Sequence, residues 1–264
     1  MGPLNQTFSS PEPAAIRDSG AVVTAVMITG MHVARYPLAK VAIECFINQT
    51  YKNKQLLIIN HGEQSLACGD PRIHEVRVTK KESETVGDLR NLAFQFATGD
   101  FLITWDDDDW YHSRRIELQM SAQKEDAAVL LMNRIHYSFE NGCSRYASAT
   151  TGWEATVLHP RDVPFRYPSL LRGSDSMFVN QFKQRIVVDD DPAMYIRFYH
   201  GLNLWDAKHI MKDLANPDLK NELKIKAKHQ RLLECVLALY KNAGYDHGFG
   251  RKTHNKSTTG PVAH

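Results

Sequence analysis

The first half of the chain alternates between two patterns of apolar residues. Short apolar runs rich in β-branched residues are typical of strands buried on both faces. Such runs lie at Ala21–Thr29, in KQLLIINHG (54–62), at Ile73–Thr79 and at Phe101–Trp105. Between them, apolar residues recur at helical spacing from Pro37 to Thr50 and over Val86–Thr98. Because a strand, a helix and a second strand in close succession form a βαβ unit, the pattern predicts a parallel sheet.

The second half of the chain is less regular. It predicts a helix at Ile116–Lys124, a strand over Ala127–Phe139, mixed strands within 151–168, a helix at Ser174–Arg185, and a strand, turn and strand over 185–200. A long helix is expected from Pro217 to Asn242, ended by Gly244. Its apolar anchors are Leu219, Leu223, Leu232, Leu233, Val236, Leu237 and Tyr240. We therefore expect an α/β fold, with a mostly parallel central sheet flanked by helices and a C-terminal helical extension.

The composition indicates a globular protein, and the sequence pattern suggests where its domain begins and ends. The chain has 264 residues, of which 43% are hydrophobic and 23% charged, as is typical of globular proteins. A net charge of +2 does not by itself indicate a nucleic-acid partner. We expect a flexible N-terminus over 1–20, one α/β domain over 21–215, the terminal helix within 216–246 and a flexible basic tail over 247–264.

The cysteines and the termini predict the cellular compartment. Cys45, Cys68, Cys143 and Cys235 are scattered without CxxC or zinc-ligand spacing, so we expect reduced thiols. The N-terminus lacks the basic and apolar pattern of a signal peptide. No stretch approaches the roughly eighteen apolar residues of a transmembrane helix. These features predict a soluble, cytoplasmic protein without a membrane span.

Four consecutive aspartates follow the strand that ends at Trp105, in the sequence WDDDDW. In open α/β sheets ligands bind at the carboxyl ends of the strands. Side chains two residues apart on an extended segment point the same way, so Asp106 and Asp108 are expected to converge on one cation, Mg²⁺ or Mn²⁺. The alternative is a solvated acidic turn that caps the next helix. The adjoining buried strand and the flanking aromatic residues favour the cation site.

An ordered series of short motifs surrounds the aspartates. The series comprises Gln49-Thr50-Tyr51 at a helix end, Gly87, Arg90 and Asn91 in one element, Ala97, Gly99 and Asp100 in another, and then Asp106–Asp108. From about Val22 to Trp205 the chain resembles the family 2 glycosyltransferases, which have the Rossmann-like GT-A fold. Each motif alone is weak, but the complete series in order and spacing is specific.

The resemblance implies a reaction and a set of site residues. A nucleotide-diphosphate sugar would bind across the strand ends, a divalent metal would bridge its phosphates, and transfer would invert the anomeric centre. Asp108 would be a metal ligand, and Asp109 would start the next helix or touch the sugar. His200, in the sequence HGLNLW, would be a further metal ligand or a diphosphate contact. The expected donor-binding residues are Thr29, Gly30, Arg35, Asn60, Gly87, Arg90, Asp106 and Asp107.

Two positions depart from the family's motifs. Asp175, the expected general base, lies in GSD where the family has Gly-Glu-Asp, and its alternative role is a helix cap. Asn60 replaces the first acid of an Asp-Asp-Gly-Ser turn that reads the nucleobase. An ionised aspartate only accepts hydrogen bonds, whereas asparagine both donates and accepts them, so Asn60 would contact the nucleobase differently. We take UDP as the expected nucleotide. A second acidic run, Asp189–Asp191, precedes Pro192 and is interpreted as a solvated turn.

Two classes of acceptor are consistent with the sequence. One class is a saccharide hydroxyl. The other is a hydroxymethylated base in DNA, because eleven Lys/Arg and five Asp/Glu lie between Lys208 and Lys256. Two other functions stay open. One is an inactive GT-A domain that binds a nucleotide-sugar or a protein partner. The other is a nucleotidyltransferase, although the loop GMHVARYP has few of the Gly and Arg/Lys residues that hold a triphosphate.

Overall fold

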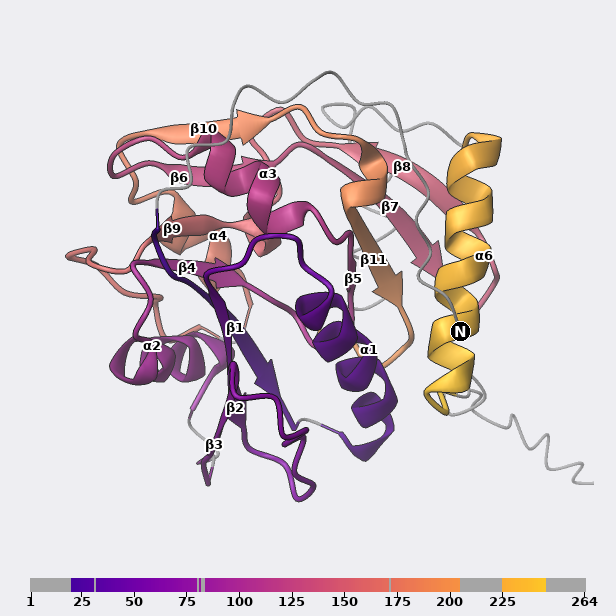
Figure 1. Cartoon of the computed structure of the whole chain (residues 1–264), viewed down its shortest axis with the longest axis horizontal. Coiled ribbons are helices and arrows are strands. Elements are labelled where there is room, and N and C mark those ends of the chain that lie inside the picture. The colour runs from indigo at the N-terminus through magenta and orange to yellow at the C-terminus, as the bar shows by residue number, and fades with distance from the viewer. Residues whose placement is uncertain are drawn as a thin grey trace, which may run out of the picture.

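The structure, a computed structural model, describes residues 20–30, 32–79, 81, 84–170, 172–204 and 225–245. Its larger sheet has seven strands in the order β10-β6-β9-β4-β1-β2-β3 (Figure 1). These are β1 (Val23–Thr29), β2 (Lys54–Asn60), β3 (Ile73–Arg77), β4 (Phe101–Thr104), β6 (Ala128–Leu131), β9 (Leu158–Pro160) and β10 (Arg185–Val188). Only β9 runs antiparallel to its neighbours in this sheet, so the prediction of a mostly parallel central sheet is confirmed.

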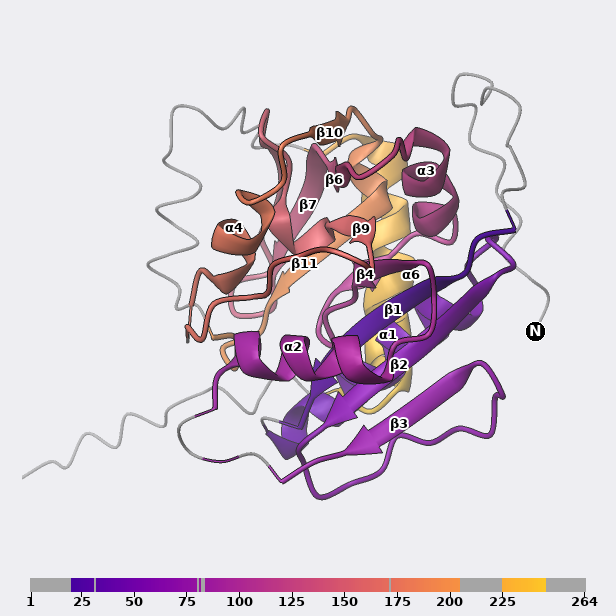
Figure 2. The same ribbon diagram turned by 90° about the vertical axis from the view of Figure 1, so that its left-hand side faces the viewer.

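Helices cover both faces of this sheet, on opposite sides of β1 and β2 (Figure 2). The alternation of side chains along the strands decides which helix they meet. Ala25 and Met27 share a core with α1 (Tyr36–Ile47), whereas Val26 and Ile28 pack with α2 (Val86–Phe96). Pro37 lies in the first turn of α1, and Thr85 and Asp88 cap α2 reciprocally.

Two further helices are shorter than the sequence predicts. α3 spans Arg115–Ala122, close to the expected range. α4 spans only Ser174–Val179, because the chain turns at Asn180 and becomes strand β10 at Arg185. The prediction of a helix over Ser174–Arg185 was therefore wrong in its second half.

A second sheet has four strands in the order β5-β11-β7-β8. They are β5 (Trp110–Tyr111), β7 (Asn133–Ser138), β8 (Ser144–Ser148) and β11 (Tyr195–Tyr199). The single strand expected over Ala127–Phe139 is in fact β6 and β7, which belong to different sheets and are separated by Met132. The carboxylate of Asp190 holds this crossing, since its Oδ1 accepts hydrogen bonds of 2.9 Å from the backbone N–H groups of Met132 and Asn133.

Asp190 also corrects the interpretation of the second acidic run. The run does form a turn, and Asp191 caps the short helical turn that begins at Pro192. However, Asp190 is buried, and burial raises its pKa to about 7. The turn is therefore not a solvated one.

The C-terminal helix α6 (Ala227–Asn242) lies beside the second sheet and α1 (Figure 1). Leu233, Val236 and Tyr240 are buried against this core, and Leu232 and Leu237 pack at its edge, as predicted. Gly244 follows the helix with a φ of 89°, the left-handed conformation that suits a glycine. The helix begins at Ala227, and its N-cap Lys226 is extended, so the prediction of one continuous helix from Pro217 was wrong. Pro217, Leu219 and Leu223 themselves lie outside the described residues, as do 1–19 and 246–264.

Two simpler predictions concern the thiols and the membrane. All four cysteines are free, as expected. Among the helices that the structure describes, none has the length and apolar character needed to cross a membrane.

Candidate functional site

Three strand ends meet at one edge of the large sheet. Thr29 ends β1, Asn60 ends β2, and the aspartates follow β4, which pairs with β1 on its other side. The loops after β1 and β2 touch at two glycines. A Cβ atom on Gly30 would lie 2.1 Å from the backbone nitrogen of Gly62, so neither loop could approach the other with a larger residue there. This contact accounts for Gly30, whose contact with the donor stays a prediction.

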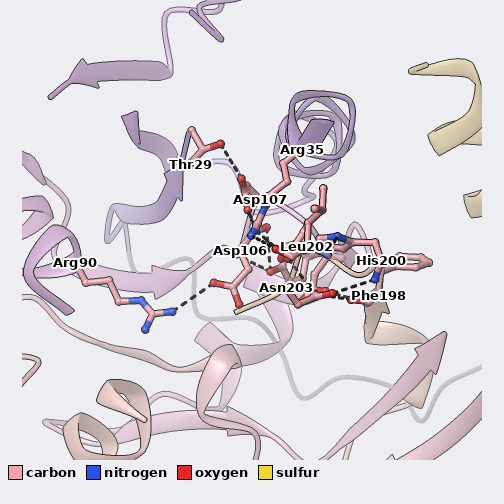
Figure 3. Close-up of polar contacts among 12 residues, drawn as sticks. Thr29, Arg35, Arg90, Asp106, Asp107, Phe198, His200, Leu202 and Asn203 are labelled. Carbon is pink, nitrogen blue, oxygen red and sulfur yellow. Dashed lines mark hydrogen bonds and ion pairs between the residues drawn. The ribbon is translucent and has the colours of Figure 1, made fainter. Parts of the chain in front are cut away.

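Asp106 faces the α2 side of the site. Its carboxylate lies 3.4 Å from Nη2 of Arg90, and Nη1 of the same guanidinium donates a 2.7 Å hydrogen bond to Asp175 (Figure 3 shows the first contact). Burial raises the pKa of Asp106 to about 6, against the opposing effect of Arg90. For Asp175 the balance reverses: Arg90 outweighs burial and lowers its pKa. Asp175 is thus held as an ionised carboxylate, the state that a general base requires.

Asp107 points in the other direction, toward β1 and α1 (Figure 3). It accepts a 2.7 Å hydrogen bond from the hydroxyl of Thr29 and a hydrogen bond from Nη2 of Arg35. Burial raises the pKa of Asp107, although Arg35 opposes this. Both carboxylate oxygens are therefore used to hold the turn, and Thr29 and Arg35, two predicted donor-binding residues, are their partners.

Asp108 meets the loop after β11. Its Oδ2 lies 2.9 Å from Nε2 of His200, 2.9 Å from Arg35 and 3.2 Å from the amide nitrogen of Asn203. Nδ1 of His200 accepts the backbone N–H of Leu202, so the ring carries its proton on Nε2 and donates it to Asp108. Burial opposes the charge, but Arg35 and His200 outweigh it and hold the pKa of Asp108 well below its usual range.

Asp109 has a structural role that the sequence did not reveal. Its carboxylate accepts a 2.6 Å hydrogen bond from the hydroxyl of Tyr195 and a 3.0 Å hydrogen bond from the backbone N–H of Phe198. Burial and the neighbouring aspartates raise its pKa to about 8. The next helix begins at Arg115, after β5, so the expectation that Asp109 starts it was wrong. Asp109 instead fixes β11 against the aspartate turn.

The side-chain amide of Asn60 is fully hydrogen-bonded to the loop that follows it and to strand β3. Its side-chain nitrogen donates to the carbonyl of Gln64 and to the carboxylate of Glu75, and its oxygen accepts the N–H of Gly62. The carboxylate of Glu75 also accepts hydrogen bonds from the loop that follows, at Ser65, Leu66 and Ala67. The carboxylate beside this loop is therefore that of Glu75, which lies on β3. The nucleobase contact predicted for Asn60 stays a prediction.

Gly87 places the loop that carries the candidate base. A Cβ atom on Gly87 would lie 2.3 Å from the carbonyl oxygen of Pro168, so the loop before α4 can lie directly on the first turn of α2. One turn later on α2, Arg90 reaches Asp175 at the N-terminus of α4. Gly87 thereby allows the loop that leads to Asp175 to pack against α2, while its predicted contact with the donor stays a prediction.

A cavity of about 420 Å³ joins these groups. One side is formed by Arg35, Arg90, Asp106, Asp107 and Asp108. α4 and the loop before it line another part of the cavity with Arg172, Ser174, Asp175 and Ser176. The remaining wall comes from the second sheet and its loops, and sequence reasoning missed it. Its polar and aromatic members are Arg134, Thr151, Trp153, Glu154, Arg197 and Asn203. Asn203 and Arg197 stand in the motif around His200, which could have signalled them, whereas nothing in the sequence marks Trp153.

The pair Asp108 and His200 fits a divalent cation. Two neighbouring ligands of an octahedral Mg²⁺ or Mn²⁺ ion lie about 3 Å apart, and Oδ2 and Nε2 are 2.9 Å apart. To bind the ion, Nε2 would have to give up the proton that it donates to Asp108, and the ring would then carry its proton on Nδ1 in place of the contact with Leu202. Oδ1 of Asp108 accepts no hydrogen bond from any described residue, so it is open to a cation as well. No group of three acidic, histidine or cysteine side chains within the described ranges is placed to hold a metal. Donor phosphates and water would therefore complete the coordination.

Comparison with known proteins places the fold. The structure superimposes on the crystal structure of TarS from S. aureus with a TM-score of 0.53 and 12% sequence identity, covering 85% of this chain and 44% of the other. For TarS 1-349 in complex with UDP-GlcNAc the TM-score is 0.51 and the identity 13%, over 85% of this chain and 72% of the other. The fold is thus the GT-A arrangement expected from the sequence.

Sequence relatives agree. A protein of Rickettsia felis described as an uncharacterized glycosyltransferase is 27% identical over 167 residues, and one of Rickettsia conorii is 25% identical over 165. Each match covers 59% of this chain and 27% of the relative, so the chain spans about a quarter of these proteins. The sequence profile named glycosyl transferase family 2 matches residues 32–191, which include the aspartate turn and Asp175. The chain belongs to glycosyl transferase family 2.

Proposed function

We propose that this chain is a metal-dependent, inverting glycosyltransferase that moves a sugar from a nucleotide-diphosphate sugar to an acceptor hydroxyl. The observation that carries the proposal is the arrangement around Arg90. It keeps Asp175 ionised at the cavity that the aspartate turn also lines, and there Asp108 contacts His200. A base and a cation site on one cavity are the two parts that such a transfer needs.

Each part has its own step. When bound, the divalent ion would stabilise the negative charge that develops on the leaving diphosphate. Asp175 removes the proton of the acceptor hydroxyl while that oxygen attacks the anomeric carbon from the side opposite the leaving group. Arg90 orients Asp175 and Asp106, which would face the ribose or the sugar. Asp107, Thr29 and Arg35 hold the turn in place.

A UDP-sugar is the donor that we propose, and the acceptor belongs to one of two classes. A structural neighbour was crystallised with UDP-GlcNAc, which supports a UDP-sugar as the donor here. A saccharide hydroxyl and a hydroxymethylated DNA base remain the two acceptor classes. Much of the basic region 208–256 that suggested DNA lies outside the described residues. A nucleotidyltransferase is disfavoured, because the only arginine of the loop after β1, Arg35, is engaged by Asp107 and Asp108.

The proposed boundaries of the domain are unchanged. We propose that residues 21–215 form the catalytic domain and that 216–246 contain the terminal helix that supports it. Within that range α6 packs on the second sheet rather than on the cavity.

Two isosteric variants test the function. Asp175→Asn should retain Mn²⁺-dependent binding of UDP-sugars in calorimetry and lose their transfer and hydrolysis. Asp108→Asn should lose the Mn²⁺-dependent part of donor binding as well. Asp162→Asn, at a carboxylate that is 94% exposed, is the control for the charge change. Full turnover in Asp175→Asn, or unchanged metal dependence in Asp108→Asn, would refute the assignment.

A further inference from the structure

The second sheet has two chemically different faces. On one face Ile135, Ile196 and Phe198 are buried in the core that includes α6. The register sets the other face, because residues paired across neighbouring strands point to the same side. Arg197 on β11 pairs with His136 on β7, and His136 pairs with Arg145 on β8. Arg134, two residues before His136, shares their side.

We call Arg134, Arg145 and Arg197 the cationic face. Its three charges surround a single buried imidazole, His136, which accepts a 2.8 Å hydrogen bond from Nε of Arg134. Burial first, and then these three arginines, hold the pKa of His136 well below its usual range. The histidine is thus neutral and cannot relieve the repulsion among the guanidinium groups. Such a cluster is costly unless an anion compensates it.

Two of the three guanidinium groups have no such anion in direct contact. Arg145 and Arg197 make no hydrogen bond and no ion pair within 4.0 Å with any residue of the described ranges. Burial lowers the pKa of Arg197, but Tyr195 and the aspartates 109, 108 and 106 outweigh it and raise the pKa. None of these groups contacts the guanidinium directly. It therefore lies at the cavity with its donors available.

A third donor lies on the same wall of the cavity. The indole of Trp153 is stacked under Arg134, whose guanidinium carbon is 3.2 Å from the ring centroid. Trp153 is only 8% exposed, and its Nε1–H has no acceptor among the described residues. A buried N–H without an acceptor is unfavourable. Trp153, Arg134 and Arg197 all line the cavity. The segment after β8 that carries Trp153 lines it from residue 149 to residue 155, and its only acidic residue there is Glu154.

The donor diphosphate does not account for these groups. Its place in the proposed reaction is at Asp108 and His200, on the aspartate turn. Arg35 and Arg90, the arginines nearest to that turn, are already engaged by Asp107, Asp108, Asp106 and Asp175. The cationic face lies on another sheet, and Arg145 extends it beyond the cavity lining.

We propose that the cationic face, with Nε1 of Trp153, binds an anionic group, a phosphate or a carboxylate, that the acceptor carries near its reacting hydroxyl. This inference rests on the proposed function, since it assigns the acceptor side of the same cavity. A phosphate or carboxylate would accept hydrogen bonds from Arg197 and from the indole, and it would neutralise the cluster around His136. The acceptor would then be a saccharide that carries a carboxylate or a phosphate rather than a neutral one.

The test compares three probes on the chain of 264 residues. p-Nitrophenyl glucoside, p-nitrophenyl glucuronide and p-nitrophenyl glucoside 6-phosphate differ only in a neutral, carboxylate or phosphate group. Calorimetric titrations are run with Mn²⁺, both with and without saturating UDP. At least one anionic probe should bind about tenfold more tightly than the neutral probe. The stronger of the two anionic probes identifies the group as carboxylate or phosphate.

Matched variants assign the effect to the cationic face. Arg145→Gln and Arg197→Gln should each remove most of the preference, and Trp153→Phe should reduce it while keeping the ring. Arg231→Gln, an exposed arginine on α6, makes the same charge change elsewhere and should leave the preference intact. Equal affinity for the three probes, binding of none, or an equal loss in Arg231→Gln would overturn the inference.

Two further outcomes separate this inference from the proposed function. If UDP binds with Mn²⁺ but the anionic probes show no preference, only the inference fails. If UDP does not bind while the preference is present, the proposed function fails and the anion site stands. A preference for UDP-glucuronic acid over UDP-glucose that Arg145→Gln abolishes would move the anion to the donor sugar and overturn the assignment to the acceptor.

Discussion

Arg90 donates a 2.7 Å hydrogen bond to Asp175 and lies 3.4 Å from Asp106, so one guanidinium connects two carboxylates from different parts of the chain. The two acids respond in opposite directions. The pKa of Asp175 is lowered, and that of Asp106 is raised to about 6 because burial prevails there. Their separation gives the cavity one carboxylate that is always ionised near neutral pH and one that can carry a proton.

This relationship predicts a shift in the pH profile. In Arg90→Gln the pKa of Asp175 should rise, because burial would act without the opposing charge. The acid limb of kcat, where the base becomes protonated, should then move to higher pH by about 1 to 3 units. Arg90→Lys retains the charge and should keep most of the wild-type limb. An unchanged limb in Arg90→Gln would show that Asp175 is not the group whose ionisation controls turnover.

The contact between the two loops predicts the cost of a single methyl group. Gly30→Ala would place Cβ against the backbone of Gly62 and also force an alanine into a φ of 106°. Gly142→Ala is a matched control, since it has a φ of 68° but open space around its Cβ. Denaturant unfolding should show a loss of about 1 to 2 kcal/mol for the control and a clearly larger loss for Gly30→Ala. Equal losses would mean that the loops separate freely.

Asp190 predicts a pH dependence of stability. Its pKa is raised from 3.8 to about 7 in the folded protein. Between these values the unfolded chain releases a proton that the folded chain retains, so the free energy of unfolding contributed by Asp190 falls as pH rises. Asp190→Asn keeps an acceptor for Met132 and Asn133 and should abolish this fall. Urea titrations from pH 4 to pH 8 measure the difference from wild type, with Asp189→Asn as the neighbouring control, and parallel curves would contradict the assignment.

The terminal helix offers a packing test. Leu233 is 1% exposed and Leu239 is 38% exposed on the same helix, α6. Leu233→Ala should lower the free energy of unfolding by about 2 to 5 kcal/mol, whereas Leu239→Ala should cost well below that. Chemical denaturation of both variants gives the comparison. Similar small losses would indicate that α6 contributes little to the stability of the domain.

The elements that the sequence predicted well are those with local signals. The strands at the centre of the large sheet are short apolar runs, and the helices between them have a clear helical period, so neither needed distant information. The break at Met132 could not be predicted, because both halves of that stretch have strand character. Its cause is Asp190, 57 and 58 residues away, which binds two successive backbone N–H groups.

The same distinction applies to the site. Asp108 and Asp175, which the motifs marked, line one cavity, and His200 contacts Asp108, while the roles of all three stay predictions. The sequence could not show that Arg35 would form ion pairs with Asp107 and Asp108. Nor could it show that the side-chain amide of Asn60 would donate a hydrogen bond to Glu75. Such pairings depend on side-chain directions that are fixed only when distant strands align. The cationic face was missed for this reason, since its arginines are scattered along three strands.

The partners of the aspartates also imply an order of assembly. Asp107 pairs with Thr29 and Arg35, which precede it along the chain, whereas Asp108 and Asp109 obtain His200 and Tyr195 only 86 to 92 residues later. Until β11 docks, Asp109 lacks its partners Tyr195 and Phe198, and Asp108 has Arg35 but not His200, so both carboxylates stay partly hydrated. Closing so long a loop is slow. The part of the cavity around Asp108 and Asp109 is therefore expected to form last during folding, after the large sheet is already in place.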